Sequence, residues 1–227
     1  MDRRLIVALD VPTVAGARAL VAQLDGLVGF YKVGMWLFFE PGVDAFIDDL
    51  VGAGHRVFLD YKMYDIPETV RRGVASAAGR GIDIVTVHGD PAILAAAAEG
   101  AGGTPFSVYA ITVLTSQDDA ALRAMGYDRP VQELVALRAD AAVAAGVPGL
   151  IAAATDLPAL RRHAGALRFA TPGIRLPGEP THDQARTATP AQALAAGAHH
   201  LVVGRPITAH ADPAARARLI LADMAAA

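Results

Sequence analysis

Eight short runs of apolar residues, rich in β-branched side chains, recur along the chain and are separated by segments of helical length. The runs are nearly continuously apolar rather than alternating, which is typical of parallel strands that are covered on both faces. Alternation of such strands with helices predicts right-handed strand–helix–strand units. The predicted strands are Leu5–Leu9, Phe30–Gly34, Arg56–Asp60, Ile82–Val87, Phe106–Thr112, Gly149–Ala153, Leu167–Ala170 and Leu201–Val203.

The segments between the runs carry helical signals. Several begin at proline, which is favoured in the first helical turn, and several end near glycine. Eight strand–helix units in 227 residues predict a single-domain (β/α)8 TIM barrel that spans residues 1–227. A doubly wound sheet is the alternative, but it usually has fewer strands, and the chain has neither a dinucleotide-binding nor a P-loop glycine pattern. The predicted helices include Thr13–Leu24, Pro67–Gly79, Pro91–Ala98, Pro130–Ala145, Thr155–His163 and Pro190–Ala196.

Composition narrows the functional classes. Apolar residues make up 53% and charged residues 19% of the chain, which excludes a disordered protein. The net charge of −3 lacks the basic footprint of a nucleic-acid binder. The absence of cysteine excludes disulfides, cysteine-ligated metals and thiol nucleophiles. Because no run is long enough for a signal-peptide core or a membrane span, we expect a soluble cytoplasmic protein without a membrane or nucleic-acid partner.

Charged residues gather at the ends of the first three predicted strands. A barrel enzyme has its active site at the C-terminal ends of its strands. A single aspartate at such a place could simply cap a helix, as Asp10 could at the first predicted helix. Thr13 could be the cap of that helix instead. A cluster is harder to explain structurally, because buried ion pairs contribute little to stability. The cluster comprises Asp10, Lys32, Asp60, Lys62 and Asp65.

Asp60 and Lys62 are two residues apart on a segment predicted to be extended, so both side chains should point to the same face, with Tyr61 pointing away. Neighbouring carboxylates favour the ammonium form of the lysine. A charged lysine can donate a proton or stabilise negative charge. It cannot form a Schiff base, which requires a neutral amine.

The last two predicted strands indicate a phosphate site. The segment Thr171–Arg175 contains a glycine that can present backbone N–H groups to an anion. The segment Gly204–Ile207 follows the eighth strand, and we expect Pro206 to open the last helix. Barrels often bind phosphate at these two loops, and Arg205 can bind it through two hydrogen bonds.

Several of these segments together resemble one known family, that of orotidine 5′-monophosphate decarboxylase. The resemblance implies a (β/α)8 barrel that converts orotidine 5′-monophosphate to uridine 5′-monophosphate and CO2. It also implies an enzyme without metal or organic cofactor, and a homodimer with active sites at the subunit interface. The matching segments are Leu5–Asp10, Tyr31–Gly34, Asp60–Thr69, Val85–His88, Thr171–Arg175 and Val202–Ile207.

The resemblance implies a role for each charged residue. Lys62 becomes the proton donor to C6 of the pyrimidine, and Asp60 lies beside the departing carboxylate. Asp65 comes from the partner subunit and completes the charge network. Lys32 and Asp10 contact the ribose, and Lys32 also hydrogen-bonds Asp60.

The remaining family positions contact the rest of the nucleotide. Thr69 lies near the ribose of the neighbouring site, and Thr115 reads the pyrimidine amide. The phosphate clamp comprises Arg175, Gln184, Gly204 and Arg205. His88 stays outside the catalytic set because Gly89-Asp90-Pro91 after it departs from the His-Ala pattern of many bacterial members.

Other functions remain as alternatives. Metal-dependent sugar-phosphate decarboxylases and aldolases share the D-x-K-x-x-D motif, but they place a glutamate on the second strand to help hold Mg²⁺. This chain has Lys32 there, and a lysine repels a divalent cation. A phosphate-binding isomerase of the tryptophan pathway leaves the charged third strand unexplained. A non-catalytic nucleotide-binding relative is disfavoured by the intact charges.

Overall fold

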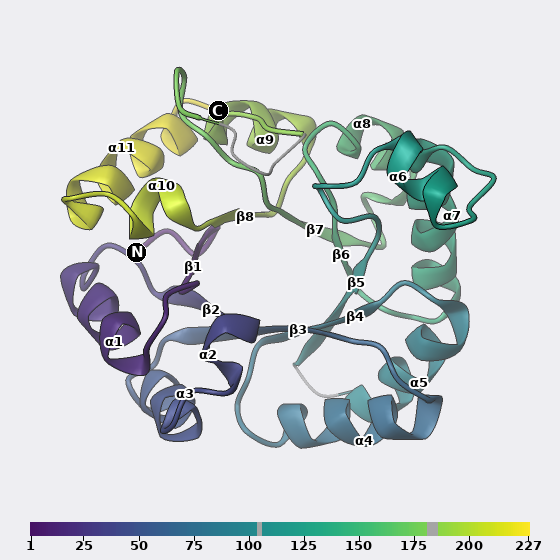
Figure 1. The fold of residues 1–227 in the computed structure, drawn as a ribbon, viewed down its shortest axis with the longest axis horizontal. Coiled ribbons are helices and arrows are strands. Elements are labelled where there is room, and N and C mark those ends of the chain that lie inside the picture. The colour runs from purple at the N-terminus through teal and green to yellow at the C-terminus, as the bar shows by residue number, and fades with distance from the viewer. Residues whose placement is uncertain (104–105, 181–185) are drawn as a thin grey trace.

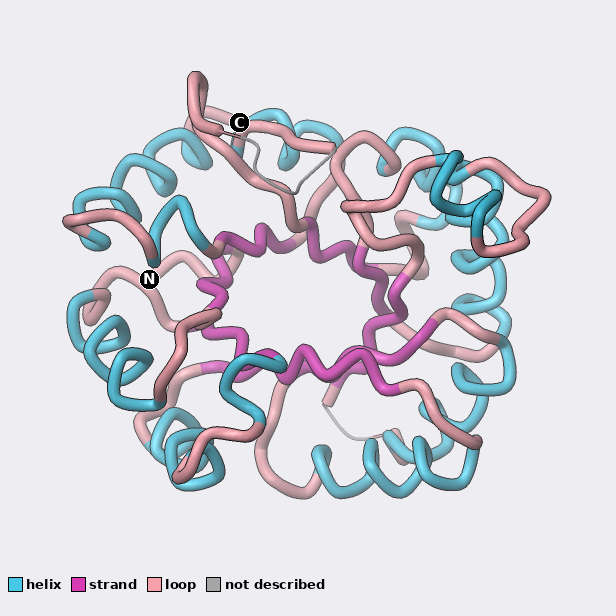
Figure 2. Tube along the Cα trace, in the orientation of Figure 1, coloured by secondary structure: helices cyan, strands magenta, loops and turns pink. Residues whose placement is uncertain are grey.

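The computed structural model describes residues 1–103, 106–180 and 186–227, and eight parallel strands close into a barrel within them. Each strand pairs with the next along the chain, and β8 pairs with β1 to close the ring (Figure 2). The predicted single (β/α)8 barrel is therefore confirmed. The strands are β1 (Leu5–Ala8), β2 (Phe30–Gly34), β3 (Arg56–Met63), β4 (Ile84–His88), β5 (Ser107–Ile111), β6 (Gly149–Ile151), β7 (Arg168–Thr171) and β8 (His200–Val203).

Most of the helices surround the barrel on its outside, while the short α2 (Met35–Phe38) contributes to a cavity at one end of it (Figure 1). The helices are α1 (Val14–Gln23), α2 (Met35–Phe38), α3 (Val43–Gly52), α4 (Pro67–Ala78), α5 (Pro91–Ala101), α6 (Asp119–Ala124), α7 (Val131–Ala144), α8 (Leu157–Leu160), α9 (Pro190–Ala196), α10 (Arg205–Thr208) and α11 (Pro213–Ala225), with a 3₁₀ turn at Arg161–His163. None of the helices in the described part of the chain is long and apolar enough to cross a membrane.

The strands are apolar on both faces because they separate two cores. On β1, Leu5 and Val7 face the helices and belong to the large outer core. Ile6 and Ala8 point the other way, into a small core that fills the barrel. The same alternation along the other strands produces the nearly continuous apolar runs of the sequence.

The barrel interior mixes bulky and very small residues. Tyr109 on β5 is 1% exposed and belongs to the inner core. Gly149 on the neighbouring β6 leaves room for it, because a Cβ atom at Gly149 would lie 2.2 Å from the tyrosine ring. Any larger residue at this position would force the ring out of its place.

The first turns of several helices are as the sequence predicts, and the cap of α1 is not Asp10. Thr13 caps α1, with its hydroxyl accepting a hydrogen bond from the Gly16 N–H at 3.1 Å. Asp10 is therefore not needed as a helix cap. Pro67, Pro91 and Pro190 all lie in the first turns of their helices, as expected.

Two helix predictions were wrong in detail. The segment predicted as one helix at Thr155–His163 is the four-residue α8 followed by the 3₁₀ turn. Pro206 opens the short α10 rather than the last helix, because Asp212 caps a new helix, α11, that starts at Pro213.

A histidine lies inside the barrel at the N-terminal ends of the strands. His200 on β8 is 5% exposed and makes an edge-to-face contact with the Phe30 ring at 5.6 Å. Its Nδ1 has no hydrogen-bond partner among the described residues. Burial, together with the nearby charges of Arg56 and Arg168, lowers the pKa of His200 to about 3.

This environment makes stability depend on pH. The unfolded chain takes up a proton on His200 below about pH 6.5, whereas the folded barrel keeps it neutral until about pH 3. The free energy of unfolding therefore does not depend on protonation of His200 above about pH 6.5. Below that pH, proton uptake by the unfolded chain lowers the free energy of unfolding by up to ~1.4 kcal/mol per pH unit. Urea unfolding at pH 7.5, 6.0 and 5.0 measures this slope.

The variant His200→Gln is the matched control because glutamine does not titrate. Its packing cost appears at pH 7.5, where both proteins are neutral at this position. Its free energy of unfolding should then fall less steeply toward pH 5 than that of the wild type. Equal slopes of the free energy of unfolding against pH in the two proteins would show that His200 does not cause the pH dependence.

Candidate active site

A cavity of about 500 Å³ opens at the C-terminal ends of the strands. It is formed by residues of seven of the eight strands or of the loops that follow them. Eight of the predicted site residues line it: Asp10, Lys32, Asp60, Lys62, Thr115, Arg175, Gly204 and Arg205. The barrel thus brings together side chains that are up to 195 positions apart in the sequence (10 to 205).

Four charged side chains form a chain of ion pairs along one side of this cavity. The Lys32 Nζ lies 2.9 Å from Asp10 Oδ1 and 3.2 Å from Asp60 Oδ2. The Lys62 Nζ lies 2.9 Å from the same Asp60 oxygen. Lys32 and Asp60 are nearly buried, whereas the side chains of Asp10 and Lys62 are both 40% exposed. The chain therefore has a buried centre and two ends that are open to a ligand.

The buried centre stays ionised. Burial disfavours the charged form of Lys32, but the carboxylates of Asp60 and Asp10 outweigh it and raise the pKa of Lys32. Burial likewise opposes ionisation of Asp60, but Lys32 and Lys62 outweigh it and lower the pKa of Asp60. Each buried charge is thus maintained by its neighbours.

A glycine makes the contact between β1 and β2 possible. A Cβ atom at Gly34 would lie 3.0 Å from the Lys32 Nζ and 3.1 Å from Asp10 Oδ1. A side chain there would push against both members of the ion pair. The absence of a side chain at Gly34, two residues after Lys32, therefore leaves room for the Lys32–Asp10 ion pair.

Lys62 reaches the cavity by a route that the sequence did not predict. The residue has φ of 49°, the only positive φ among the described non-glycine residues. Asp60 and Lys62 both line the cavity and Tyr61 packs against the outer core, so the prediction that the two charged side chains share one face is confirmed. The segment is not evenly extended, however, although the sequence pattern predicts that it is. The pairing of β3 with β4 is irregular between Leu59 and Met63, and this irregularity turns Lys62 toward Asp60.

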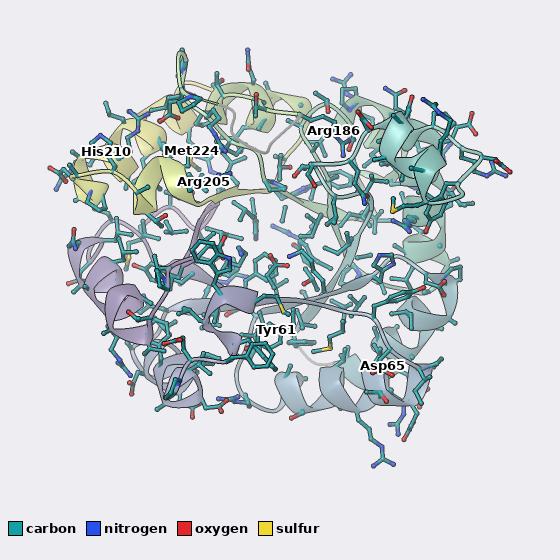
Figure 3. All side chains as sticks on the ribbon, viewed as in Figure 1. Tyr61, Asp65, Arg186, Arg205, His210 and Met224 are labelled. Carbon is teal, nitrogen blue, oxygen red and sulfur yellow. The ribbon has the colours of Figure 1, made fainter. Side chains whose placement is uncertain are left out.

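The loops after β7 and β8 form another part of the cavity wall. Gly173 has φ of 78° and lines the cavity together with Pro172 and Arg175. Arg175 is 9% exposed and donates hydrogen bonds to the Ile174 and Pro180 carbonyls, which shape the loop around it. Arg205, labelled in Figure 3, follows β8 and begins α10.

A comparison with protein families matches residues 3–220 to the orotidine 5′-phosphate decarboxylase / HUMPS family. The chain belongs to this family. The orotidine 5′-phosphate decarboxylase of Afipia carboxidovorans is 49% identical to it over 99% of this chain and 95% of that protein. The enzyme of that name from Rhodopseudomonas palustris is 47% identical with the same coverage.

A solved structure agrees with this membership. The crystal structure of orotidine 5′-phosphate decarboxylase from Lactobacillus acidophilus matches with a TM-score of 0.84 and 35% sequence identity. The match covers 98% of this chain and 99% of that one. The family resemblance inferred from the sequence motifs is thus confirmed over almost the entire chain.

Two predicted family positions lie outside the cavity of this chain. Asp65 is exposed near α4, and its carboxylate accepts a hydrogen bond from the Ile66 N–H at 2.6 Å (Figure 3). It lines a shallow surface hollow with Tyr64 and Ile66 instead. Thr69 is exposed on α4. A third position, Gln184, lies outside the described residues.

His88 remains outside the charge cluster, as expected. Its ring lies 4.4 Å from that of Tyr64, and its Nδ1 has no hydrogen-bond partner among the described residues. Burial, and then the charge of Arg138, lowers the pKa of His88. These contacts indicate a packed histidine.

The sequence alone missed three contributors to this family site. Met35 and Trp36 on α2 line the cavity, but a four-residue apolar helix gives no periodic signal. Arg186 forms an ion pair with the buried Asp156 at 2.5 Å and also contacts the carbonyls of Val113 and Leu114. Arg186 thereby connects the end of the long loop after β7 to the loop that carries Thr115. No local sequence pattern predicts this contact.

The ion-pair geometry predicts unequal costs for removing the two lysines. Lys32→Met leaves buried Asp60 with one partner fewer, so it should lower the free energy of unfolding by about 3–5 kcal/mol. Lys62→Met removes a much more exposed partner and should cost less than about 1 kcal/mol. Chemical denaturation of both variants at pH 7 tests the difference. Equal losses would contradict the assignment of Lys32 as the buried centre.

Proposed function

We propose that this protein decarboxylates orotidine 5′-monophosphate to uridine 5′-monophosphate and CO2, with Lys62 as the proton donor to C6. The observation that carries the proposal is the fixed ammonium of Lys62, held 2.9 Å from Asp60 at the open end of the ion-pair chain inside the cavity. The names of the relatives in the same family support the choice of reaction.

The chemistry requires stabilisation of a negative charge on carbon. When the bond between C6 and the carboxylate breaks, its electron pair stays on C6 and CO2 leaves. The ammonium of Lys62 stabilises this charge and then transfers a proton to C6, which gives uridine 5′-monophosphate and a neutral amine. The amine takes a proton from water before the next turnover. Because Asp60, which is itself paired with Lys32, already holds the ammonium in place, little reorganisation is needed during the reaction.

The remaining lining residues suit the rest of the nucleotide. In this proposal Asp60 lies beside the departing carboxylate, and Asp10 and Lys32 bind the ribose hydroxyls. Thr115 reads the pyrimidine amide. The phosphate binds to Arg175, Gly204, Arg205 and Gln184.

The proposal uses neither a metal nor an organic cofactor. The position between the carboxylates of Asp10 and Asp60, where a divalent cation would otherwise bind, holds the ammonium of Lys32. A second positive charge there would be strongly repelled. This disfavours the alternative of a metal-dependent sugar-phosphate decarboxylase or aldolase.

We also propose that the protein acts as a homodimer in which Asp65 enters the site of the partner subunit. Asp65 and Thr69 are exposed and lie outside the cavity of their own chain. Large apolar side chains are exposed on α2 and on the segment that carries Asp65, and such surfaces mark protein interfaces. They are Trp36, Phe38, Phe39, Tyr64 and Ile66, exposed by 43 to 80%.

Release of CO2 from orotidine 5′-monophosphate tests the reaction directly. The wild type should release CO2 at the same rate with and without EDTA. Activity that EDTA abolishes and Mg²⁺ restores would favour the metal-dependent alternative. No release under any condition would exclude the proposed reaction.

Variants of Lys62 test the proton donor. Lys62→Ala should abolish detectable turnover, while binding of uridine 5′-monophosphate, measured by calorimetry, stays largely intact. Lys62→Arg is the matched control, because it keeps the positive charge but does not give up a proton near neutral pH. It should be nearly as inactive as Lys62→Ala. Turnover close to that of the wild type in either variant would remove Lys62 from the donor role.

Mixing two inactive variants tests the shared site. Subunits with Asp65→Ala and subunits with Lys62→Ala should each be inactive alone. Random reassociation should restore about a quarter of the sites, because half of the dimers are mixed and each has one intact site. Activity that does not return in dimers shown to have exchanged would argue against a site shared across the interface.

A further inference from the structure

The irregular pairing between β3 and β4 leaves a gap in the backbone hydrogen bonds next to Lys62. Leu59 pairs with Val85 and Met63 pairs with Val87. Three residues of β3, from Asp60 to Lys62, therefore lie opposite the single residue Thr86 of β4. A bulge of this kind takes backbone N–H groups out of the regular ladder, and each needs another partner.

The hydroxyl of Thr86 supplies that partner. The Lys62 N–H donates a hydrogen bond to Thr86 Oγ1 at 2.9 Å. The same hydroxyl donates its own proton to Asp60 Oδ1, also at 2.9 Å. A hydroxyl has one proton to donate and lone pairs to accept with, so both bonds form at once. Thr86 is 0% exposed, so water does not compete for them.

These two hydrogen bonds hold the two members of the Asp60–Lys62 ion pair, one through its side chain and the other through its backbone. Asp60 is held by its carboxylate, through Oδ1, while its Oδ2 lies 3.2 Å from the Lys32 Nζ and 2.9 Å from the Lys62 Nζ. Lys62 is held by its backbone, at the residue whose positive φ is unfavourable for a lysine. A single buried oxygen thus fixes both ends of the segment that aims the ammonium.

We propose that Thr86 is a positioning residue that sets the placement of the Lys62 ammonium relative to Asp60. The inference rests on the proposed function for its catalytic consequence, but its structural content stands on the bulge geometry. Valine has nearly the same shape as threonine but no hydroxyl. It would leave the Lys62 N–H unpaired and one Asp60 oxygen without its donor, and the segment would relax into another conformation.

Kinetics of two matched pairs of variants test the role of the oxygen. Thr86→Val should lower kcat by about 100-fold, the scale expected when a catalytic group is displaced by about 1 Å. Thr86→Ser keeps the hydroxyl and should retain kcat within about fivefold. Thr86→Ala differs from Thr86→Ser only by the oxygen and should behave like Thr86→Val. Binding of uridine 5′-monophosphate should change little in all three, because the phosphate and base contacts are untouched.

Thr112→Val is the control for loss of a buried hydroxyl elsewhere. Thr112 is also 0% exposed, and its hydroxyl donates to the Ile151 carbonyl at 2.7 Å. This variant should lose stability but keep kcat. A Thr86→Val enzyme within about threefold of the wild type would overturn the proposal, as would a Thr86→Ser enzyme as slow as Thr86→Ala.

Crystal structures keep the test independent of the reaction. In the wild type, Lys62 should show positive φ and should contact Asp60. In Thr86→Val, at least one of these two features should be lost. Thr86→Ala replaces Thr86→Val in this test if the valine variant does not fold. Retention of both features would overturn the positioning role. A wild type that releases no CO2 would overturn the proposed function alone, and the structures would still decide the role of Thr86.

Discussion

The site depends on one carboxylate held between two lysines. Asp60 is almost buried, and a buried charge is costly unless charged and hydrogen-bonding partners surround it. Lys32 and Lys62 supply the positive charges, and Thr86 supplies a hydrogen bond. Loss of the buried Lys32 would leave Asp60 with its desolvation cost and without its buried charged partner, whereas loss of the more exposed Lys62 removes a weaker attraction. The stability of the buried carboxylate therefore depends mainly on its buried partners, Lys32 and Thr86.

The closed barrel explains how this set can be built from distant parts of the chain. Asp10 follows β1, and Lys32 and Asp60 lie on the neighbouring parallel strands β2 and β3, so their side chains meet at one end of the barrel. Because β8 pairs with β1, the loop with Gly204 also lies beside Asp10, and a Cβ atom at Gly204 would be 3.9 Å from its Oδ2. Closure thus brings the loops that we propose to bind phosphate next to the charges that we propose to act on the reacting carbon.

Much of this architecture could be predicted from the sequence. Eight strands were recognisable because each is buried on both faces, and the charges at their ends stood out against that apolar background. The positive φ of Lys62 could not be predicted, because it depends on the pairing of β3 with β4 and on the hydroxyl of Thr86. The pairing of Arg186 with Asp156 was also hidden, since the two residues are 30 positions apart and meet only after the barrel has closed.

The central claim is that the Lys62 ammonium faces the carbon that loses CO2. A crystal structure with uridine 5′-monophosphate bound tests it most directly. The account predicts the Lys62 Nζ in contact with C6 of the pyrimidine, and the phosphate between the loops after β7 and β8. A nucleotide bound with C6 turned away from Lys62, or with its phosphate at the Asp60 end of the cavity, would contradict it.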